Sequence, residues 1–313
     1  MTDLAGRWRH RVADLGFAAG WGLVRRLPEG LATSVFQAGA DLAVRRDGPA
    51  VAQLRRNLAR VVPQASGAEL DELVRGGLRS YARYWRETFR LPGMDHREIC
   101  RRVEAEFVNK SMLDEALSRG KGLVLALPHT GNWDVSGMWL VNHSGRFTTV
   151  VERLRPESLF QRFVAYRQSL GFEILPTSGT DVSSYRLLIE RLRQNRVVCL
   201  PADRDLSRRG IPVTFFGERT RMPAGPARLA AMTGATLLIV NQAFTPDGWA
   251  VGVHSPMIVH EREEIPAVTQ RMADGFAADI AANPVDWHML QPLWLADLPD
   301  DRQRALAESR ERT

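Results

Sequence analysis

The segment LVLALPHTGNWDVSGMWL, residues 123–140, predicts the fold and the position of the candidate site. Its first five residues are apolar, a pattern typical of a strand that is buried on both faces. Pro128 ends that strand because proline cannot donate a hydrogen bond to a sheet. His129 follows at once, and Asp134 comes five residues later, at the start of a second apolar run. The segment therefore predicts a buried strand, a polar loop and a helix, in that order.

The rest of the chain repeats this alternation of strand and helix. Short apolar segments rich in β-branched residues are separated by longer helical patterns, which indicates parallel strands covered by helices on both faces. The predicted fold class is therefore α/β, with a central, mostly parallel β-sheet and a helical N-terminal region. We expect strands at 121–128, 146–151, 171–176, 196–201 and 235–240, helices at 133–141, 157–170, 182–194, 223–233 and 264–283, and an edge strand or hairpin within 249–259.

The N-terminal region has a helical pattern up to Pro92. No repeat or low-complexity linker divides the chain, so we expect a single domain, 1–313, with an α/β core at 115–295 and two helices over 4–44 that break near Pro28. The first of these helices carries an apolar stripe. Two interpretations of the stripe stay open: the helix docks on the core, or it lies in a membrane interface with arginines at headgroup level. The stripe consists of Leu4, Trp8, Val12, Leu15, Ala19 and Leu23.

The charge of the chain suits an anionic partner. The formal net charge is +6, and only two of the 42 basic residues are lysines. A membrane surface, a phosphorylated lipid or a nucleotide would match this charge. The uncharged run at 15–24 is shorter than the roughly 20 residues of a bilayer span, so we expect no membrane-spanning segment. Cys100 and Cys199 form no CxxC pair and no zinc motif is present, so we expect neither a disulfide framework nor a metal site.

Polar side chains follow several of the predicted strands. Glu152 follows the second strand, and Asp203 and Asp205 follow the fourth. The carboxyl ends of parallel strands meet at one edge of a sheet, which is where ligands bind. Arg167 lies in the middle of the apolar face of helix 157–170, and a buried guanidinium needs an anionic partner. We expect that partner to be Glu152 or Asp203, in a pair that is either structural or catalytic.

His129 and Asp134 are the candidate catalytic pair. If a helix begins near Asn132, Asp134 lies in its first turn and can turn back to His129, which would fix the tautomer and leave the other ring nitrogen basic. A structural histidine is the alternative, and the position at the sheet edge favours the catalytic interpretation. No G-x-S-x-G motif is present, and Cys199 lies in an apolar strand. The histidine would therefore activate water or a substrate hydroxyl.

At this point the sequence resembles a known family. HTGNWD (129–134) is similar to the H-x4-D/E motif of glycerolipid and lipid A acyltransferases. Longer stretches resemble the phosphatidylinositol mannoside acyltransferases of mycobacteria, a group within the lipid A and lysophospholipid acyltransferase superfamily. The similarity extends over nearly the whole chain. It includes ALPHTGNWDVSGMWLV (126–141), VVERLRPESLFQRFVAYRQSLGFEILP (150–176), NRVVCLPADRDL (195–206), FFGERTRMPAGPARLA (215–230) and ANPVDWHMLQPLWLADL (282–298).

The resemblance implies a reaction and its partners. It implies transfer of a long acyl chain, typically palmitoyl, from acyl-CoA to the 6-hydroxyl of the mannose on the 2-position of inositol, in mono- or dimannosylated phosphatidylinositol. Palmitoyl-CoA, phosphatidylinositol mannosides and an anionic membrane surface would be the partners, and acyl-CoA would be a co-substrate with no further cofactor. The location implied is peripheral, at the cytoplasmic face of the plasma membrane. A lipid acceptor favours the membrane interpretation of the helices within 1–44.

The resemblance also implies roles for single residues. His129 matches the catalytic base of the family, and Asp134 matches the acid of the same motif. Glu152, Arg167 and Asp203 fall on positions implicated in the site, and Asp203 is shorter than the glutamate of close relatives. We expect these three residues and Arg204 to bind substrate, Met138, Trp139, Phe160 and Phe163 to line an acyl channel, and Arg208, Arg209, Arg219 and Arg221 to contact CoA phosphates or lipid headgroups.

The expected mechanism needs no acyl-enzyme. The acceptor hydroxyl attacks the thioester while His129 takes its proton, and backbone N–H groups after His129 stabilise the oxyanion. Two other classes of protein stay open: a thioesterase in which His129 activates water, and a lipid-binding protein without chemistry. A nucleic-acid binder ranks last because no RRM, KH or zinc-finger pattern is present, so we expect no nucleic-acid partner.

Overall fold

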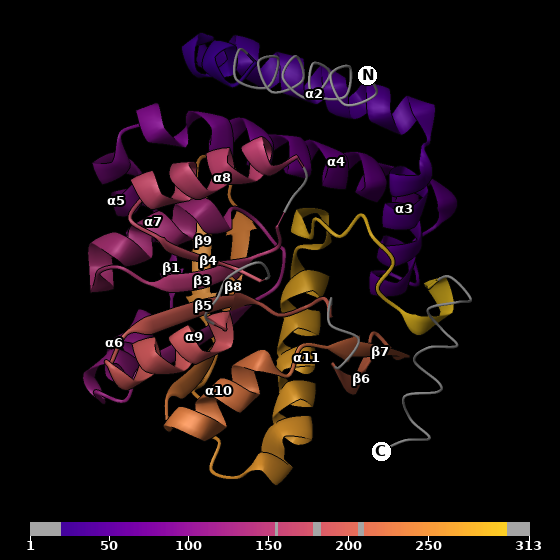
Figure 1. The fold of residues 1–313 in the computed structure, drawn as a ribbon. Helices are drawn as coiled ribbons and strands as arrows, with labels where there is room; N and C mark the ends of the chain where they lie inside the picture. The colour runs from indigo at the N-terminus through magenta and orange to yellow at the C-terminus, as the bar shows by residue number, and fades with distance from the viewer. Residues whose placement is uncertain (1–19, 154–155, 178–182, 206–209, 299–313) are drawn as a thin grey trace, which may run out of the picture.

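The centre of the protein is a seven-stranded sheet, drawn in Figure 1 from a computed structural model that describes residues 20–153, 156–177, 183–205 and 210–298. The strand order is β1-β9-β8-β2-β5-β3-β4. The last five strands in this order are parallel to one another, β9 is antiparallel to β8, and β1 is parallel to β9. The predicted mostly parallel α/β sheet is confirmed. The strands are β1 (Phe107–Val108), β2 (Leu123–Leu127), β3 (Thr148–Val151), β4 (Glu173–Pro176), β5 (Val197–Pro201), β8 (Thr236–Phe244) and β9 (Trp249–Val253).

Strand β2 shows why helices cover both faces of the sheet. Val124 and Ala126 belong to one hydrophobic core, whereas the residues on either side of them belong to the other. All five residues of β2 are buried, so the strand has no face for water. The layer on the face of Val124 contains α9 (Ser184–Arg193), α10 (Gly225–Thr233) and α11 (Ile265–Ala282). The opposite layer contains α5 (His96–Ala105), α6 (Lys110–Ser118), α7 (Trp133–Ser144) and α8 (Glu157–Ser169).

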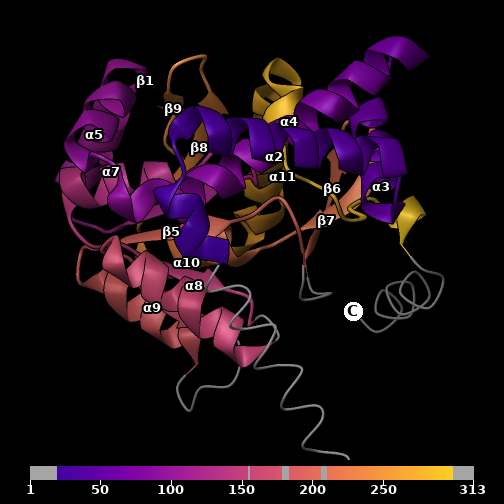
Figure 2. The ribbon, with the colours of Figure 1, turned by 90° about the horizontal axis from the view of Figure 1, so that it is seen from above.

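Three N-terminal helices form a third core. These are α2 (Glu29–Arg46), α3 (Pro49–Val61) and α4 (Gly67–Arg90), with α2 packed along α4 as Figures 1 and 2 show. Ser66 and Glu69 start α4 with a capping box. The break predicted near Pro28 is confirmed, because residues 20–26 are helical and α2 begins at Glu29. Of the predicted apolar stripe, Leu23 is described, and Leu4, Trp8, Val12, Leu15 and Ala19 lie outside the described residues.

Several elements were not predicted from the sequence. A second, two-stranded sheet pairs β6 (Ile211–Phe215) with β7 (Glu218–Met222), and neither strand is among those expected from the sequence. Phe216 and Gly217 join the two strands with φ of 49° and 76°, the left-handed backbone that a two-residue hairpin turn requires. Strand β1 and helices α5 and α6 were also missed. Short 3₁₀ turns lie at η1 (Leu91–Gly93), η2 (Arg262–Glu264), η3 (Pro284–Asp286) and η4 (Leu295–Asp297).

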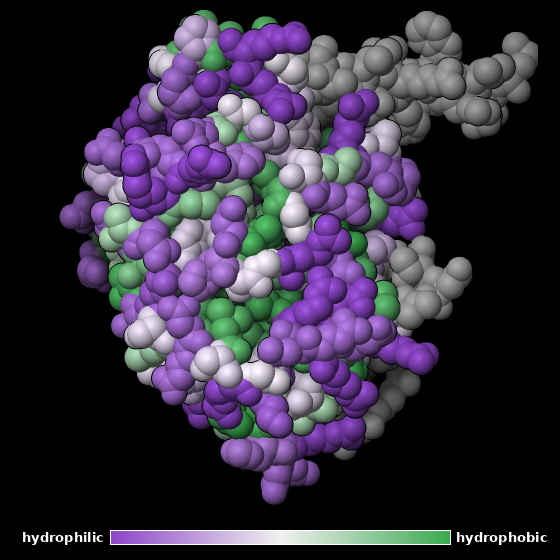
Figure 3. Space-filling view, turned by 90° about the vertical axis from the view of Figure 1, so that its left-hand side faces the viewer, coloured by the Kyte–Doolittle hydropathy of each residue, from purple (hydrophilic) through white to green (hydrophobic). Residues whose placement is uncertain are grey.

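The surface of the protein is mixed in polarity. Figure 3 shows one face on which hydrophilic side chains surround a hollow where apolar side chains gather. Among the described residues, no helix has both the length and the apolar composition to span a bilayer.

Candidate active site

His129 is paired with Asp203, and the sheet register explains why. Strands β2 and β5 are parallel neighbours in which Leu127 lies beside Pro201. Two residues further along each strand, His129 Nδ1 lies 2.6 Å from Asp203 Oδ1, and the His129 backbone N–H donates to Oδ2 over 3.0 Å. Asp203 is fully buried, whereas 44% of the His129 side chain is exposed. The carboxylate therefore fixes the ring, and the other ring nitrogen is left for a substrate.

A segment near the C-terminus closes this arrangement. Trp287 Nε1 donates to Asp203 Oδ2 over 3.0 Å, and the His288 N–H donates to the His129 carbonyl over 2.9 Å. The His288 ring lies between Tyr81, Tyr84 and Phe244, and its Nε2 is 2.9 Å from the Ser80 hydroxyl. Burial lowers the pKa of His288 to about 3, and the charge of His129 acts in the same direction. No local pattern in the sequence singles out His288, because the residues around its ring lie far away along the chain.

The charge of Asp203 determines the basicity of His129. The surrounding protein restricts access of water to the ring and so lowers its pKa, but the charge of Asp203 and its hydrogen bond outweigh this, and the pKa of His129 is raised. Arg204, which follows Asp203, has a positive charge that lowers the same pKa. Burial would raise the pKa of Asp203, but His129 and the N–H donors lower it below its usual value. Asp203 is thus an anion beside a strengthened base.

The effect of Asp203 can be measured in a pH profile. If neutral His129 is the base, activity falls at low pH as the ring is protonated, so the raised pKa moves this acid limb to higher pH. We expect Asp203→Asn to move the acid limb of kcat/KM to lower pH and to reduce kcat. Asp114→Asn is the matched control, because Asp114 pairs with a different histidine, His143, over 2.6 Å. An acid limb that stays in place in Asp203→Asn would contradict the assignment of Asp203.

Asp134 does not contact His129 as the sequence analysis predicted. Among the described contacts, Asp134 Oδ1 accepts from Arg167 Nε over 2.9 Å, and Oδ2 accepts from Tyr84 and Thr88 over 3.3 and 3.4 Å. The first turn of α7 places this carboxylate in the interior, where it is fully buried. The prediction that Asp134 orients the imidazole is therefore wrong. Glu152 or Asp203 was predicted to be the partner of Arg167. This prediction is also wrong, because Arg167 pairs with Asp134.

Arg167 is held between an anion and an aromatic ring. Its guanidinium carbon lies 4.1 Å from the centroid of the Trp133 ring, and 12% of its side chain is exposed. Burial lowers the pKa of Arg167, but Asp134 and the two nearby tyrosines raise it by more. The net pKa is raised, so Arg167 remains a cation. The prediction that Arg167 lies on an apolar face with an anionic partner is correct. Only the identity of that partner was missed.

Glu87 on α4 holds the loop that follows His129. This buried carboxylate accepts from Asn132 Nδ2 over 2.7 Å and from Trp249 Nε1 over 2.8 Å, and it forms an ion pair with Arg83. Asn132 in turn caps α7 by accepting from the Val135 N–H. The loop is therefore fixed from the side of the N-terminal helices, although no local pattern in the sequence pointed to Glu87.

The other predicted substrate-binding residues lie at the edge of the site. Glu152 follows β3 and is exposed, and the described residues give it no hydrogen bond or ion pair. Asp205 accepts from the Gly210 N–H over 2.8 Å. Arg219 and Arg221 lie on β7, and Arg221 donates to the Gly210 carbonyl. Arg208 and Arg209 lie outside the described residues.

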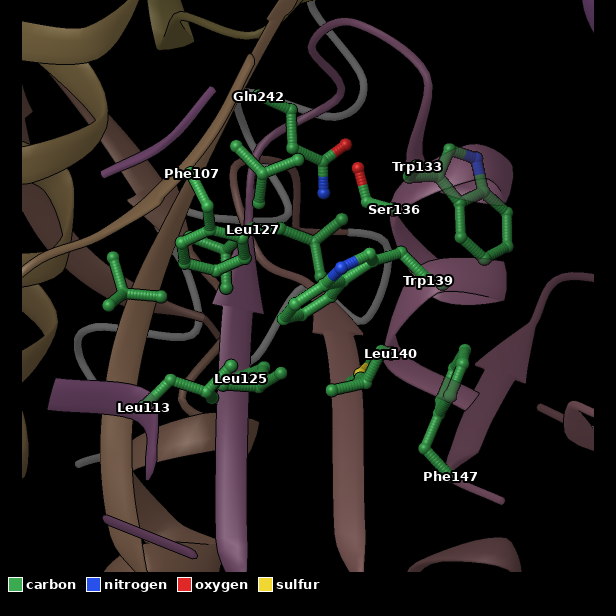
Figure 4. Close-up of a pocket in the computed structure, with 15 residues that line it drawn as sticks. Phe107, Leu113, Leu125, Leu127, Trp133, Ser136, Trp139, Leu140, Phe147 and Gln242 are labelled. Carbon is green, nitrogen blue, oxygen red and sulfur yellow. The ribbon is translucent and has the colours of Figure 1, made fainter. Parts of the chain in front are cut away.

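An apolar cavity lies beside the His129 loop, between β2, β8, β9 and α7 (Figure 4). Its empty space is about 450 Å³ when the open solvent at its mouth is included, and about 40 Å³ of it is open to the centre of a water molecule. Of the residues expected to line an acyl channel, Trp139 lines this cavity, and Met138, Phe160 and Phe163 do not. The helical period turns other residues of α7 than Met138 toward the cavity, and Phe160 and Phe163 lie on α8, which contributes nothing to the lining. Its polar lining residues are Ser136 and Gln242, at the end nearest the His129 loop. The lining also includes Phe107, Leu113, Leu125, Leu127, Leu140 and Phe147.

The backbone donors expected for an oxyanion are already used. The Thr130 N–H donates to the Pro128 carbonyl over 2.9 Å, and the Gly131 N–H donates to the Asp286 carbonyl over 3.0 Å. The prediction that the N–H groups directly after His129 stabilise the oxyanion is therefore wrong for Thr130 and Gly131.

The two cysteines are free thiols. Cys199 is buried and lines the cavity, and burial raises the pKa of its thiol, as expected for a core residue. The described part of the chain has no group of three His, Cys, Asp or Glu side chains placed to hold a metal ion.

The chain is similar to known acyltransferases over nearly its whole length. Residues 9–296 match the family described as bacterial lipid A biosynthesis acyltransferase. A phosphatidylinositol mannoside acyltransferase of Mycolicibacterium smegmatis is 54% identical over 296 residues, which cover 95% of this chain and 96% of that protein. A protein of the same name from Mycobacterium tuberculosis is 53% identical over 295 residues, covering 94% and 92%. The protein is an acyltransferase, and it belongs to the bacterial lipid A biosynthesis acyltransferase family.

Proposed function

We propose that the protein transfers a long acyl chain, palmitoyl, from acyl-CoA to the 6-hydroxyl of the 2-linked mannose of phosphatidylinositol mono- or dimannoside. The observation that carries this proposal is the His129–Asp203 pair beside an apolar cavity, in a chain more than half identical to proteins named for that acceptor. Acyl-CoA is a fitting donor because the CoA thiolate is a good leaving group, so the acyl chain can pass directly to the acceptor without an acyl-enzyme.

His129 carries the proton through both halves of the proposed reaction. Its free ring nitrogen takes the proton of the sugar hydroxyl as that oxygen forms a bond to the thioester carbonyl carbon. The carbonyl electron pair moves to its oxygen, giving a tetrahedral intermediate. When the pair returns, the carbon–sulfur bond breaks, and the imidazolium gives its proton to the thiolate of CoA. The ester and CoA–SH are the products, and His129 is neutral again.

The cavity is the proposed site of the acyl chain. Leu127 lies two residues before His129 and lines the cavity, and Trp133, the first residue of α7, lines it too. A chain held there would present its carbonyl to the ring, and two reactants fixed in this way react much faster than free ones. Arg167 and Arg204 are the proposed contacts for the anionic acceptor or for CoA phosphates.

Helix α2 is the proposed membrane contact. Leu31, Val35 and Leu42 lie on one face of α2 and are 52%, 53% and 45% exposed. Arg45 and Arg46, in the last turn of the helix, are exposed as well. An apolar stripe beside arginines fits an interface of anionic lipids, so we place the protein peripherally, at the cytoplasmic face of the plasma membrane.

The membrane contact predicts a loss of vesicle binding. We expect the triple variant Leu31→Ser, Val35→Ser and Leu42→Ser to bind anionic vesicles at least ~10-fold more weakly, because less apolar surface leaves water. Sedimentation with phosphatidylglycerol-containing vesicles measures this. Val108→Ser on β1 is the control, since Val108 is 59% exposed outside α2. Equal vesicle binding by the triple variant and the wild type would remove α2 from the interface.

Weighing the lipid products tests the proposed reaction. Purified protein is incubated with palmitoyl-CoA and, separately, phosphatidylinositol, its monomannoside and its dimannoside. We expect the mannosides alone to gain the mass of one palmitoyl group, and fragmentation should place it on the 2-linked mannose. Release of CoA and free palmitate with no acylated lipid would point to a thioesterase instead.

A further inference from the structure

Gln242 is a buried polar residue in the lining of the apolar cavity. Strand β8 directs Leu238 and Val240 into the core on the side of α7, and Gln242 continues this series. Its side chain lines the cavity together with Val240, and the residue is only 4% exposed. Its Oε1 atom is buried without a hydrogen-bond partner among the described residues. An unpaired buried amide of this kind costs about 1–3 kcal/mol.

Gln242 lies next to the loop that carries His129. The ladder between β2 and β8 places Ala126 beside Ile239, so that three residues later His129 is level with Gln242. Gly131, with φ of +54°, lies so close that a β-carbon there would be 3.0 Å from the carbonyl carbon of Gln242. In Figure 4 the amide of Gln242 faces Ser136 at one end of the cavity, and the apolar side chains extend away from it. The amide is thus at the end of the cavity that adjoins the catalytic loop.

We infer that the side-chain amide of Gln242 donates a hydrogen bond to the carbonyl oxygen of the bound thioester and to the oxyanion that forms from it. This inference rests on the proposed function. A carbonyl at this end of the cavity needs a donor, and the N–H groups of Thr130 and Gly131 are taken by Pro128 and Asp286. The amide is held on a strand and is shielded from water, which are the conditions under which one donor has a large effect.

Replacing Gln242 should affect stability and catalysis differently. In Gln242→Leu an apolar side chain of similar size replaces an unpaired amide, so we expect a melting temperature equal to or above that of the wild type. The kcat for acyl transfer should fall about 10²–10³-fold, the usual loss when one oxyanion donor is removed. The KM for acyl-CoA should rise by no more than the ~5-fold that the loss of one hydrogen bond to the thioester carbonyl causes, so the main effect is on kcat. Gln168→Leu is the control, since Gln168 is exposed on α8.

Two unreactive analogues of acyl-CoA test the carbonyl contact directly. An S-alkyl-CoA thioether has the chain but no carbonyl, and we expect wild type and Gln242→Leu to bind it equally. A ketone analogue, with a methylene group between sulfur and carbonyl, should bind Gln242→Leu at least ~5-fold more weakly, the loss of one hydrogen bond. Calorimetric titration of the full-length protein measures both affinities.

The outcomes separate this inference from the proposed function. If the wild type acylates the lipid and Gln242→Leu retains its full kcat, the donor lies elsewhere. Equal weakening of thioether and ketone binding would also overturn the inference, because Gln242 would then only shape the cavity. If the wild type itself transfers no acyl group from acyl-CoA, the proposed function fails, and the analogue titrations still show whether the amide recognises a carbonyl.

Discussion

His129→Ala should lower kcat for acyl transfer by about 10²–10⁴-fold, the usual contribution of a general base. The variant lacks the group that takes the proton of the acceptor hydroxyl, and no cysteine or serine nucleophile stands in for it in the proposed mechanism. Release of CoA should fall in parallel with formation of the acylated lipid. Mass spectrometry of the lipid and a thiol assay for CoA measure the two products.

The fold should survive this substitution. The His129 side chain is 44% exposed, and Asp203 retains two donors, Trp287 Nε1 and the backbone N–H of residue 129. His260→Ala is the matched control. That residue is exposed, and it donates to Glu264 through its backbone N–H, which alanine retains. A His129→Ala protein that keeps its circular dichroism spectrum and more than about one tenth of its activity would eliminate the base assignment.

Asp134→Ala should destabilise the protein by about 3–5 kcal/mol, because it leaves the guanidinium of Arg167 buried without a counter-charge. Tyr84 and Thr88 would lose an acceptor in the same place. Urea denaturation followed by tryptophan fluorescence measures the free energy of unfolding. The acid limb of the pH profile should stay where it is in any folded Asp134→Ala protein, because Asp203 holds the His129 ring.

A double variant isolates the charge from the packing. Asp134→Leu combined with Arg167→Met removes both charges and should recover most of the lost free energy, since a buried ion pair contributes little over apolar residues of similar size. A loss below about 1 kcal/mol in Asp134→Ala would contradict the structural role. A shifted acid limb would restore Asp134 as a partner of His129.

Much of the fold could be predicted because burial leaves a local signature. Residues 123–127 are apolar at every position, and such a run is compatible with a strand covered on both faces. The β6–β7 hairpin was missed because its turn, Phe216-Gly217, lacks the usual Asn-Gly or Asp-Gly pair and its strands carry charges. Strand β1 was missed because it has only two residues.

The candidate site could be predicted only as far as local patterns reach. His129 and Asp203 were placed at the same sheet edge, but their pairing depends on β2 and β5 being neighbours, and one sequence does not reveal strand order. Asp134 was chosen because it is near in sequence, although the first turn of α7 directs it to Arg167. Glu87 and Gln242 come from distant segments, so their proximity to the loop depends entirely on tertiary packing.

Helix α4 connects the proposed membrane helix to the catalytic loop. Arg79 and Arg86 of α4 pair with Asp41 and Glu29 of α2, and Glu87 of the same helix binds Asn132. If α2 rests on lipid as proposed, His129 keeps a constant height above the bilayer, and an acceptor arrives by lateral diffusion rather than from bulk water. Turnover should then obey surface-dilution kinetics, in which the mole fraction of acceptor in the vesicle sets the rate at constant total acceptor.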